Sequence, residues 1–396
     1  MSTFIIENRD LVAAVKKASV SEKNTYELKV ATNVEPNSGK HMASLCTCNG
    51  SVQTIAFLLV TSDDVTDEVD MIFPASFSKT VTTLAAYTDD AFKIEVTDNS
   101  CSISCGEASI NLEMLQTAVR IEPLDPSANK FAQITIETGA LKKAIEIGSS
   151  AMSSEEGKMA AVRNAIEIAP VKVDGEEKLR VISVDTLGFF AAGAMADIKQ
   201  AGGLDDMIDK KAFVLNSVFC RIIGSLTSAS VDLMLFDKQV MMRDGNDFYI
   251  ITPNAAPFTK EIFNALYADM PSVYSMSVSR KSLMSALDIA LIGASDMEDN
   301  KACLHISNGM VAVRAMRRDN RAGVMAEDVS GEMEIGIDGI ILKKAIAHLG
   351  ASISVSGAGP KAPIYIKNGE PGVVVFVAPC RLDTEGGETS KEEKQE

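Results

Sequence analysis

The feature that most constrains the fold of this chain is a helical pattern that occurs three times at broadly similar intervals. Asn8–Ser19, Thr138–Ala151 and Ser279–Ser295 each follow a short segment with strand character. Each then places Leu, Ala and a second aliphatic residue three and four positions apart, as Leu11/Ala14/Val15, Leu141/Ala144/Ile145 and Leu283/Ala286/Leu287. Residues at this spacing share one face of a helix, so each segment predicts an amphipathic helix.

A second helix and a series of strands are predicted behind each of these helices. The second helices are expected at Pro74–Tyr87, Leu215–Leu226 and Ile337–Gly350. Asp-Asn, Asp-Gly and Asn-Gly pairs mark hairpins in the strand series that follow. Pro-bearing stretches around Pro123, Pro126 and Pro271 separate the units. The chain therefore predicts three α+β units, each ordered strand–helix–strands–helix–strands. Duplication by itself carries no functional message.

Composition excludes some classes of protein and leaves others open. Hydrophobic residues make up 46% of the chain and the net charge is −16, so a uniformly basic surface is excluded but a local basic stripe is not. No segment approaches the ~20 apolar residues of a membrane span, and the first residues lack the basic start of a signal peptide. We expect a cytoplasmic protein without membrane contact, whose seven Cys are reduced.

Catalytic and metal-binding motifs are missing from the sequence. The three His residues, His41, His305 and His348, are scattered, so no metal site is predicted. There is no Gly-x-Ser-x-Gly elbow, phosphate loop or His-Glu-x-x-His motif. The stretches "SGAGPKAP" and "RDGND" (Arg243–Asp247) are interpreted as a hairpin and a turn. The sequence thus disfavours an enzyme and predicts no catalytic residue and no cofactor.

Four stretches of the chain match one known family. "GEMEIGIDGIILKKAI" looks like that family's segment entering its last helix, and "MIFPASFSKTVTTL" resembles the segment opening the second helix of its first domain. "KAPIYIKN" and "VVVFVAPCRL" are similar to its terminal strands, which end in Met-Pro-Met-Arg-Leu. The chain thus resembles the bacterial DNA polymerase III beta subunit, the beta sliding clamp, of which it would be a divergent member. The resemblance extends from Phe4 to Leu382, and its order and spacing make it specific.

The resemblance implies an α+β fold of three tandem processivity-fold (DNA clamp) domains. The expected boundaries are 1–125, 131–266 and 272–382. Two chains would join head to tail into a dimeric ring with helices lining the hole. Residues 383–396 are predicted to be a disordered acidic tail, because they include no aliphatic or aromatic residue and are rich in Glu, Lys and Gly.

The function implied is that of a DNA sliding clamp. Such a processivity factor encircles duplex DNA without sequence preference and tethers the replicative DNA polymerase and other clients through a peptide-binding pocket. The partners implied are DNA, the polymerase, a clamp loader, clamp-binding peptides and a second copy of the chain. The alternative is a clamp-fold interaction scaffold that no longer encircles DNA. Neither alternative is an enzyme, and a clamp would be a non-catalytic accessory subunit of a DNA-directed DNA polymerase.

Basic residues on the expected helices are the candidates for facing DNA, and a loop Lys joins them because of its position in the family. Contacts from a ring that slides would be made to phosphates, which position a protein without reading sequence. The candidates are Lys16, Lys17, Lys23, Lys79, Lys142, Arg163, Arg221, Lys281 and Lys343.

The apolar terminal strand is the candidate wall of the peptide pocket. Its first half is expected to pair in a sheet, and pairing should stop at Pro379, which has no N–H. The second domain carries Val184-Asp185-Thr186-Leu187-Gly188-Phe189 where the family has Thr-Asp-Gly-His-Arg-Leu, so polar and cationic groups are missing at the pocket's edge. The predicted pocket residues are Val162, Val184, Phe189, Ile341, Pro363, Phe376, Val377, Ala378, Pro379, Cys380, Arg381 and Leu382.

Overall fold

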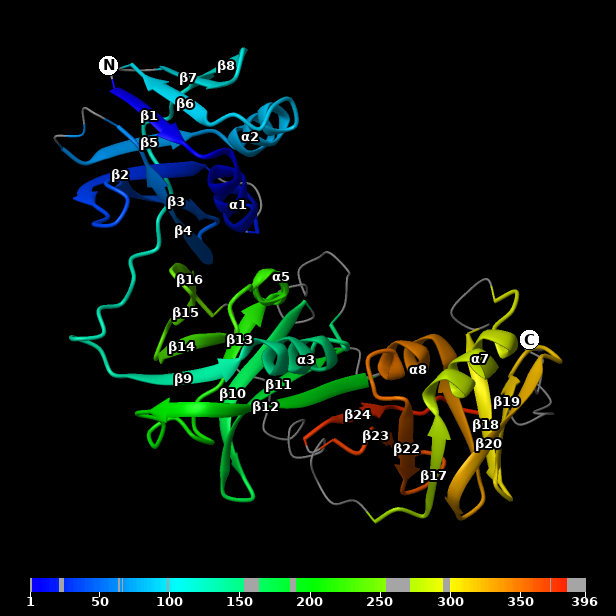
Figure 1. The fold of residues 1–396 in the computed structure, drawn as a ribbon. Helices are drawn as coiled ribbons and strands as arrows, with labels where there is room; N and C mark the ends of the chain where they lie inside the picture. The colour runs from blue at the N-terminus through cyan, green and yellow to red at the C-terminus, as the bar shows by residue number, and fades with distance from the viewer. Residues whose placement is uncertain are drawn as a thin grey trace, which may run out of the picture. The chain divides into compact units, whose positions relative to one another are not determined.

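A computed structural model gives the fold of the chain (Figure 1). It describes residues 2–20, 25–62, 65, 67–97, 100–152, 164–185, 190–253, 271–294, 300–370 and 372–382. The predicted tail, residues 383–396, lies outside the described residues.

Within the described residues, the order of the elements repeats three times, as the sequence predicts: one strand, one helix, four strands, a second helix and three strands. The first repeat comprises β1 (Ser2–Ile6), α1 (Asn8–Ala18), β2 (Tyr26–Val34), β3 (His41–Cys48), β4 (Val52–Val60), β5 (Val69–Phe73), α2 (Phe77–Ala85), β6 (Phe92–Val96), β7 (Ser100–Cys105) and β8 (Ala108–Glu113).

The second and third repeats follow the same order. The second comprises β9 (Phe131–Glu137), α3 (Thr138–Gly148), β10 (Ala165–Val173), β11 (Glu176–Val184), β12 (Phe190–Gly202), β13 (Phe213–Asn216), α5 (Ser217–Ser225), β14 (Ser230–Phe236), β15 (Val240–Asp244) and β16 (Asp247–Ile251). The third comprises β17 (Tyr274–Ser279), α7 (Arg280–Ala290), β18 (Lys301–Ser307), β19 (Met310–Ala315), β20 (Arg321–Ser330), β21 (Met333–Asp338), α8 (Gly339–Ile346), β22 (Ser352–Gly357), β23 (Ile364–Lys367) and β24 (Val374–Val377).

The helices form where the apolar spacing predicts them. All nine residues of the three predicted apolar faces are buried, with exposed fractions of 4% or less. Helix α2 begins later than the sequence suggests, at Phe77, because Pro74 lies in the preceding turn and its carbonyl accepts the Phe77 N–H at 2.9 Å. The two stretches interpreted from the sequence as a turn and a hairpin have these structures. Arg243–Asp247 connects β15 to β16, and "SGAGPKAP" connects β22 to β23.

The chain divides into two compact units. Unit one consists of Met1–Ile145, Glu167–Leu179 and Ala196–Pro257, and unit two consists of the rest of the chain. The domain limits 1–125, 131–266 and 272–382 stay predictions.

In unit one, two antiparallel sheets enclose a core with the first two helices. One sheet has the order β1-β6-β7-β8. The other runs β5-β2-β3-β4-β16-β15-β14-β9 through successive antiparallel pairs. Phe4, Leu11, Leu28, Phe77 and Ile94 meet in the core, so both sheets and both helices contribute to it.

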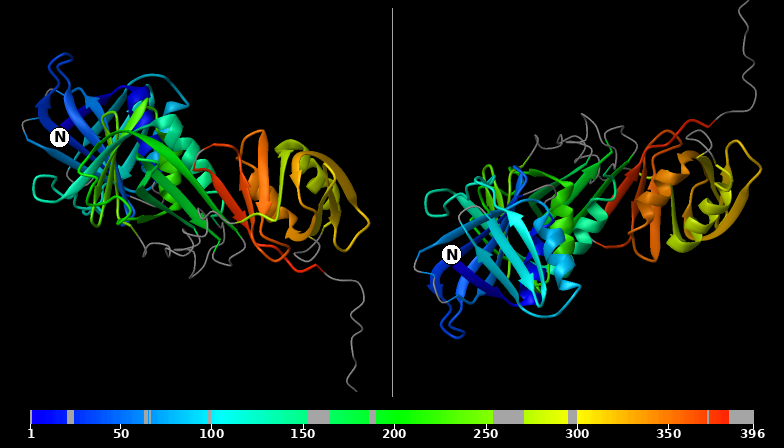
Figure 2. Two further views of the ribbon diagram at one scale, coloured as in Figure 1. Left: turned by 90° about the horizontal axis from the view of Figure 1, so that it is seen from below. Right: turned by 90° about the horizontal axis from the view of Figure 1, so that it is seen from above.

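In unit two, strand β24 lies between β23 and the first residues of β12, and Figure 2 shows β12 and β24 from two further directions. The sheet continues from β23 to β22, β17 and the second half of β20. The first half of β20 turns into a second sheet with the order β21-β18-β19-β20.

Consecutive repeats are joined by strand pairing at two seams. Seam one pairs β4 with β16, and seam two pairs β12 with β24. In both, the third strand after the first helix of one repeat pairs with the last strand of the next repeat. At seam one, buried Asp247 adds polar contacts, because it accepts the Phe57 N–H at 3.0 Å and forms an ion pair with Lys17.

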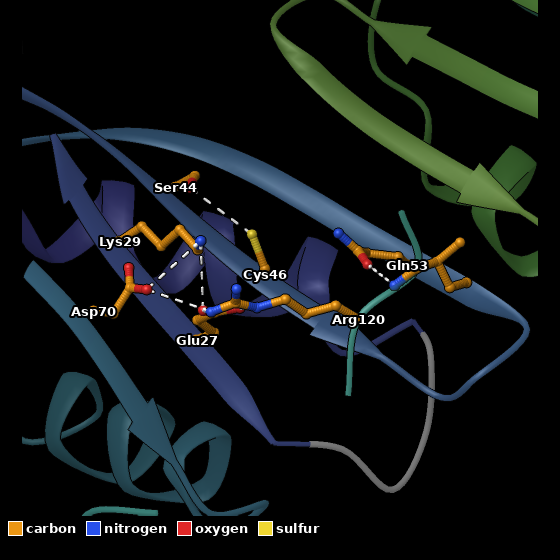
Figure 3. Close-up of polar contacts among 8 residues, drawn as sticks. Glu27, Lys29, Ser44, Cys46, Gln53, Asp70 and Arg120 are labelled. Carbon is orange, nitrogen blue, oxygen red and sulfur yellow. Dashed lines mark hydrogen bonds and ion pairs between the residues drawn. The ribbon is translucent and has the colours of Figure 1, made fainter. Parts of the chain in front are cut away.

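The connector from Met114 to Lys130 lies along unit one and is held by side chains from both repeats. Gln53 of β4 accepts the Ile121 N–H at 2.6 Å, and Gln239 accepts the Leu124 N–H at 2.9 Å. Arg120 points into a charged cluster on the first repeat, where its Nε lies 3.0 Å from Glu27 (Figure 3).

Candidate functional site

The terminal strand is central in its sheet, and side chains on both of its faces are buried. It pairs with β23 along one edge and with β12 along the other. Val375 and Val377 on one face are no more than 1% exposed, and Val374 on the other face is 5% exposed. Burial on both faces accounts for its apolar sequence.

Pairing of β24 ends at Val377, two residues before Pro379, as the missing N–H predicts. It resumes at one position, which the sequence did not predict: the Cys380 N–H donates to the Gly336 carbonyl at 2.9 Å. Gly336 leaves room for this approach, since a Cβ there would lie 2.6 Å from the Cys380 carbonyl oxygen and 3.2 Å from Leu382 Cδ2. Cys380 and Leu382 therefore lie against Gly336 of β21, just before α8.

An apolar cluster brings the second repeat and the terminal strand together at seam two. Val184 and Phe376, both predicted, belong to it. The Phe376 ring lies 6.3 Å from that of Tyr365, centroid to centroid. Sequence reasoning missed the other members, which are Ile182, Ala191, Tyr365 and Val374. Ile182 and Val374 alternate along their strands with Val184 and Phe376. Ala191 and Tyr365 join through cross-strand pairing with Phe376.

The remaining predicted pocket residues differ in exposure, and two of them lie outside the described residues. Ile341 is half-buried in the first turn of α8, where Asp338 accepts its N–H at 3.0 Å. Its neighbour Ile340 is 50% exposed. Pro363, Ala378, Pro379, Cys380 and Leu382 are half-buried, and Arg381 is exposed. Val162 and Phe189 lie outside the described residues.

Three of the candidate DNA-facing cations are engaged within the protein. Lys17 pairs with Asp247, and Lys343 of α8 pairs with Asp288 of α7. Lys142 donates to the Leu226 carbonyl, which ends α5, at 2.9 Å. These contacts compete with phosphate for the same ammonium groups.

Four other candidates are exposed on helices: Lys16, Lys79, Arg221 and Lys281. Within the described part of the chain, Lys16, Lys79 and Lys281 have no ion-pair partner. The last two candidates, Lys23 and Arg163, lie outside the described residues.

Lys344, next to Lys343, is partly withdrawn from water. Its ammonium lies 5.5 Å from the Phe190 ring centroid and donates to the Met152 carbonyl at 2.7 Å. Burial lowers the pKa of Lys344, and the charge of Asp185 acts in the opposite direction.

No group of three or more potential metal ligands occurs among the described residues. None of the seven Cys is in a disulfide. Burial raises the pKa of Cys46 to about 11 and that of Cys101 to about 12, so these thiols are protonated at neutral pH. Over the described residues, no helix combines the length and the apolar character needed to cross a bilayer.

Known proteins resemble this chain in structure only. No protein-family profile matches the chain, and no curated protein matches its sequence. Among solved structures, the C. crescentus beta sliding clamp superposes with a TM-score of 0.79 at 18% identity, covering 96% of this chain and 100% of that one. The Bacillus subtilis DNA polymerase sliding clamp gives 0.75 at 18% identity, covering 96% and 99%. The Helicobacter pylori beta clamp, solved with a DNA ligase peptide, gives 0.73 at 12% identity, covering 96% and 100%. The chain therefore has, over nearly its whole length, the fold of the DNA polymerase III beta sliding clamps.

Proposed function

We propose that this protein is a DNA sliding clamp, a non-catalytic processivity factor that acts in the cytoplasm. The observation that carries the proposal is the full-length likeness to beta sliding clamps, combined with three repeats joined by seams of one kind. A peptide segment of a client protein, such as the replicative polymerase, would bind the ring and so tether that protein to it. A clamp loader would open the ring around DNA.

Strand order supports closure of the ring by a second copy. Each seam uses the third strand after the first helix of one repeat and the last strand of the next. Two strands are left over: β20 of the last repeat and β8 of the first. Among the described residues, β8 pairs only with β7, and Arg321–Met325 of β20 pairs only with β19. Pairing β20 with the β8 of another copy would repeat the seam head to tail.

The free edge of β20 has room for a partner strand. A cleft of about 650 Å³ beside it is lined by residues of β17, β20 and the start of α7. Met325 on this edge is 79% exposed. On β8, Ile110 and Leu112 are half-buried and alternate with exposed polar residues. With three repeats in each chain, two chains supply the six that a closed ring of this family would have, and light scattering should give about twice 42.3 kDa.

The helix cations support weak DNA binding without sequence preference. Lys16, Lys79 and Lys281 are exposed and have no ion-pair partner among the described residues, whereas Lys17, Lys142 and Lys343 have internal partners. Each contact between a cation and a phosphate makes DNA affinity more sensitive to salt. Because few cations are available, we expect DNA affinity to fall only gradually as salt concentration rises. Weak contacts of this kind suit a ring that slides.

The apolar cluster at seam two is the best candidate for the client pocket. Val184, Tyr365 and Phe376 provide an apolar surface, and half-buried Ala378, Pro379, Cys380 and Leu382, which follow Phe376 along the chain, would extend it. Burying a client's aliphatic or aromatic side chain there would contribute roughly 1.5–3 kcal/mol each. Replacing Ile341 or Leu382 with Asp should abolish binding of a family-type peptide without dissociating the dimer.

The alternative is a clamp-fold scaffold that does not encircle DNA, and the internal partners of Lys17, Lys142 and Lys343 favour it. One experiment separates the two. The protein is assembled on nicked circular DNA with the loader of the same cell, and retention is compared before and after the circle is cut. A clamp stays on the circle and slides off the linear product. A scaffold is retained on neither, or equally on both.

A further inference from the structure

Unit one contains a cleft of about 810 Å³ that takes no part in the pocket at seam two. Three segments line it: the end of the connector with the start of β9, the loop after β12, and the turn between β14 and β15. All three belong to unit one.

The floor of the cleft is apolar. Phe131 and Phe236 stack there with ring centroids 5.3 Å apart, and Phe236 is fully buried. Met207 is 7% exposed and completes the floor with half-buried Leu124. The half-buried Phe131 ring presents apolar surface to whatever enters the cleft, and the buried Phe236 ring supports it.

This floor continues into an apolar surface on seam one that corresponds to the client pocket on seam two. At seam two, Tyr365, Phe376 and Ala191 lie in one row across β23, β24 and β12. At seam one, Met241, Ile250 and Gln53 lie in the equivalent row across β15, β16 and β4. Met241 and Ile250 belong to the same apolar cluster as Phe131 and Phe236.

The chain's own connector already occupies part of the seam-one surface as a peptide would. Ile121 and Leu124 pack on the cluster, and the backbone N–H groups of both donate to glutamines. The glutamines are almost fully buried, Gln53 at 8% and Gln239 at 5% exposed. An extended segment with apolar side chains therefore fits this surface, and the cleft lies where the connector leaves it.

The walls of the cleft are fixed by backbone contacts. Gln239 also donates to the Glu122 carbonyl at 3.1 Å, which ties the connector to the second repeat. Gly203 has a φ of +72°, and a Cβ there would lie 2.8 Å from the Phe131 carbonyl oxygen. Only glycine allows the loop after β12 to approach the start of β9 so closely. A preformed cleft loses little entropy when a ligand binds.

The rim is locally positive on an acidic protein. Three lysines and two aspartates line the cleft, giving one net positive charge on a chain of net charge −16. Lys211 is paired with Asp237, and Asp206 is exposed. Lys130 and Lys238 are exposed and have no ion-pair partner within the described ranges. Two available ammonium groups thus flank an apolar floor.

We propose that this cleft is a second peptide-docking site, for a partner segment that combines an aromatic side chain with carboxylates. The aromatic side chain would pack on Phe131, Phe236 and Met207, and the carboxylates would lie beside Lys130 and Lys238. Nothing in this inference requires that the protein encircle DNA, so it stands apart from the proposed function.

The test uses the full-length protein and a fluorescent peptide, acetyl-Glu-Glu-Phe-Glu-Glu-amide, with anisotropy as the readout. The double variant Lys130→Glu/Lys238→Glu should bind about tenfold more weakly, because each exposed charge pair contributes modestly and both are reversed. Replacing Phe in the peptide by Ala should cost at least about tenfold.

Two control proteins locate the binding. Lys93→Glu/Lys172→Glu makes the same change of charge on exposed lysines of unit one that do not line the cleft, and should leave affinity unchanged. Ile341→Asp damages the client pocket and should also leave it unchanged. Binding that is lost in Ile341→Asp and kept in the cleft variant would assign the peptide to the pocket and overturn the proposal. Equal binding of acetyl-Lys-Lys-Phe-Lys-Lys-amide, or no binding by the unmodified protein, would overturn it as well.

Discussion

Glu27 shows how a single residue in unit one is stabilised by the connector. It is only 3% exposed on β2, and its carboxylate accepts from both Nε and a terminal nitrogen of Arg120 (Figure 3). Lys29 and Asp70 complete the cluster. A buried carboxylate is stable only while its charge is compensated, so the connector contributes to the stability of the first repeat.

Removing the arginine should therefore cost stability. We expect Arg120→Ala to lower the free energy of unfolding by about 1–3 kcal/mol, since it leaves the buried carboxylate with the weaker compensation of Lys29. Urea denaturation measures the change. Arg9→Ala is the matched control, because Arg9 is 88% exposed in an ion pair with Asp10, and it should change the value by no more than ~0.5 kcal/mol. Equal effects of the two substitutions would contradict this account.

Asp244 should make stability depend on acid pH. Burial favours its neutral form, but hydrogen bonds from Ser228 and Thr227 and the charge of Lys17 outweigh this, and the pKa of Asp244 lies below its usual value. A lowered pKa in the folded state stabilises the protein above the unfolded value of about 3.9, and this stabilisation is lost as pH falls through the folded value. Asp244→Asn should lower the free energy of unfolding at neutral pH. When the pH is lowered, this variant should lose less further stability than the unmodified protein. Urea denaturation at neutral and at acid pH measures both effects.

At the scale of elements, the helices could be predicted from sequence more fully than the contacts between strands. The spacing of Leu283, Ala286 and Leu287 is a local sequence pattern that defines one face of a helix. These three residues are buried in the structure, as the pattern predicts. The β4–β16 and β12–β24 pairs join residues nearly two hundred positions apart. No local pattern encodes which strands meet. The predicted pocket followed from the family resemblance, whereas Tyr365 and Ala191 became apparent only once the seam was known.

Helix α8, which carries the predicted pocket residue Ile341, offers a test of capping. Asp338 accepts the N–H groups of Ile340 at 2.9 Å and Ile341 at 3.0 Å. Asp338→Ala should lower stability by about 1 kcal/mol through loss of the cap. Ser76 precedes α2 in the same position but makes no capping hydrogen bond, so Ser76→Ala should change stability by no more than a few tenths of that. Thermal unfolding compares the two. A loss in Ser76→Ala as large as in Asp338→Ala would show that capping is not the cause.

At the scale of the whole molecule, the repeated seam leaves one unused strand in the first repeat and one in the last. Met325→Glu should weaken self-association by about tenfold, because it places a charge on the exposed edge of β20. Sedimentation measures the dissociation constant. Val34→Glu, at a 47% exposed position on β2, should leave it unchanged. If the dimer forms equally well with Glu at position 325, then another surface joins the copies.

The seven thiols have a practical consequence for chemical labelling. Cys46, Cys48, Cys101, Cys105 and Cys303 are buried, whereas Cys220 and Cys380 are half-buried. Thiol reagents attack the thiolate, so maleimide should modify Cys220 on α5 and Cys380 beside Gly336 long before the other five react. In a Cys220→Ser background, the rate of alkylation at Cys380 becomes a native reporter of the pocket. A bound client should slow it without any engineered probe.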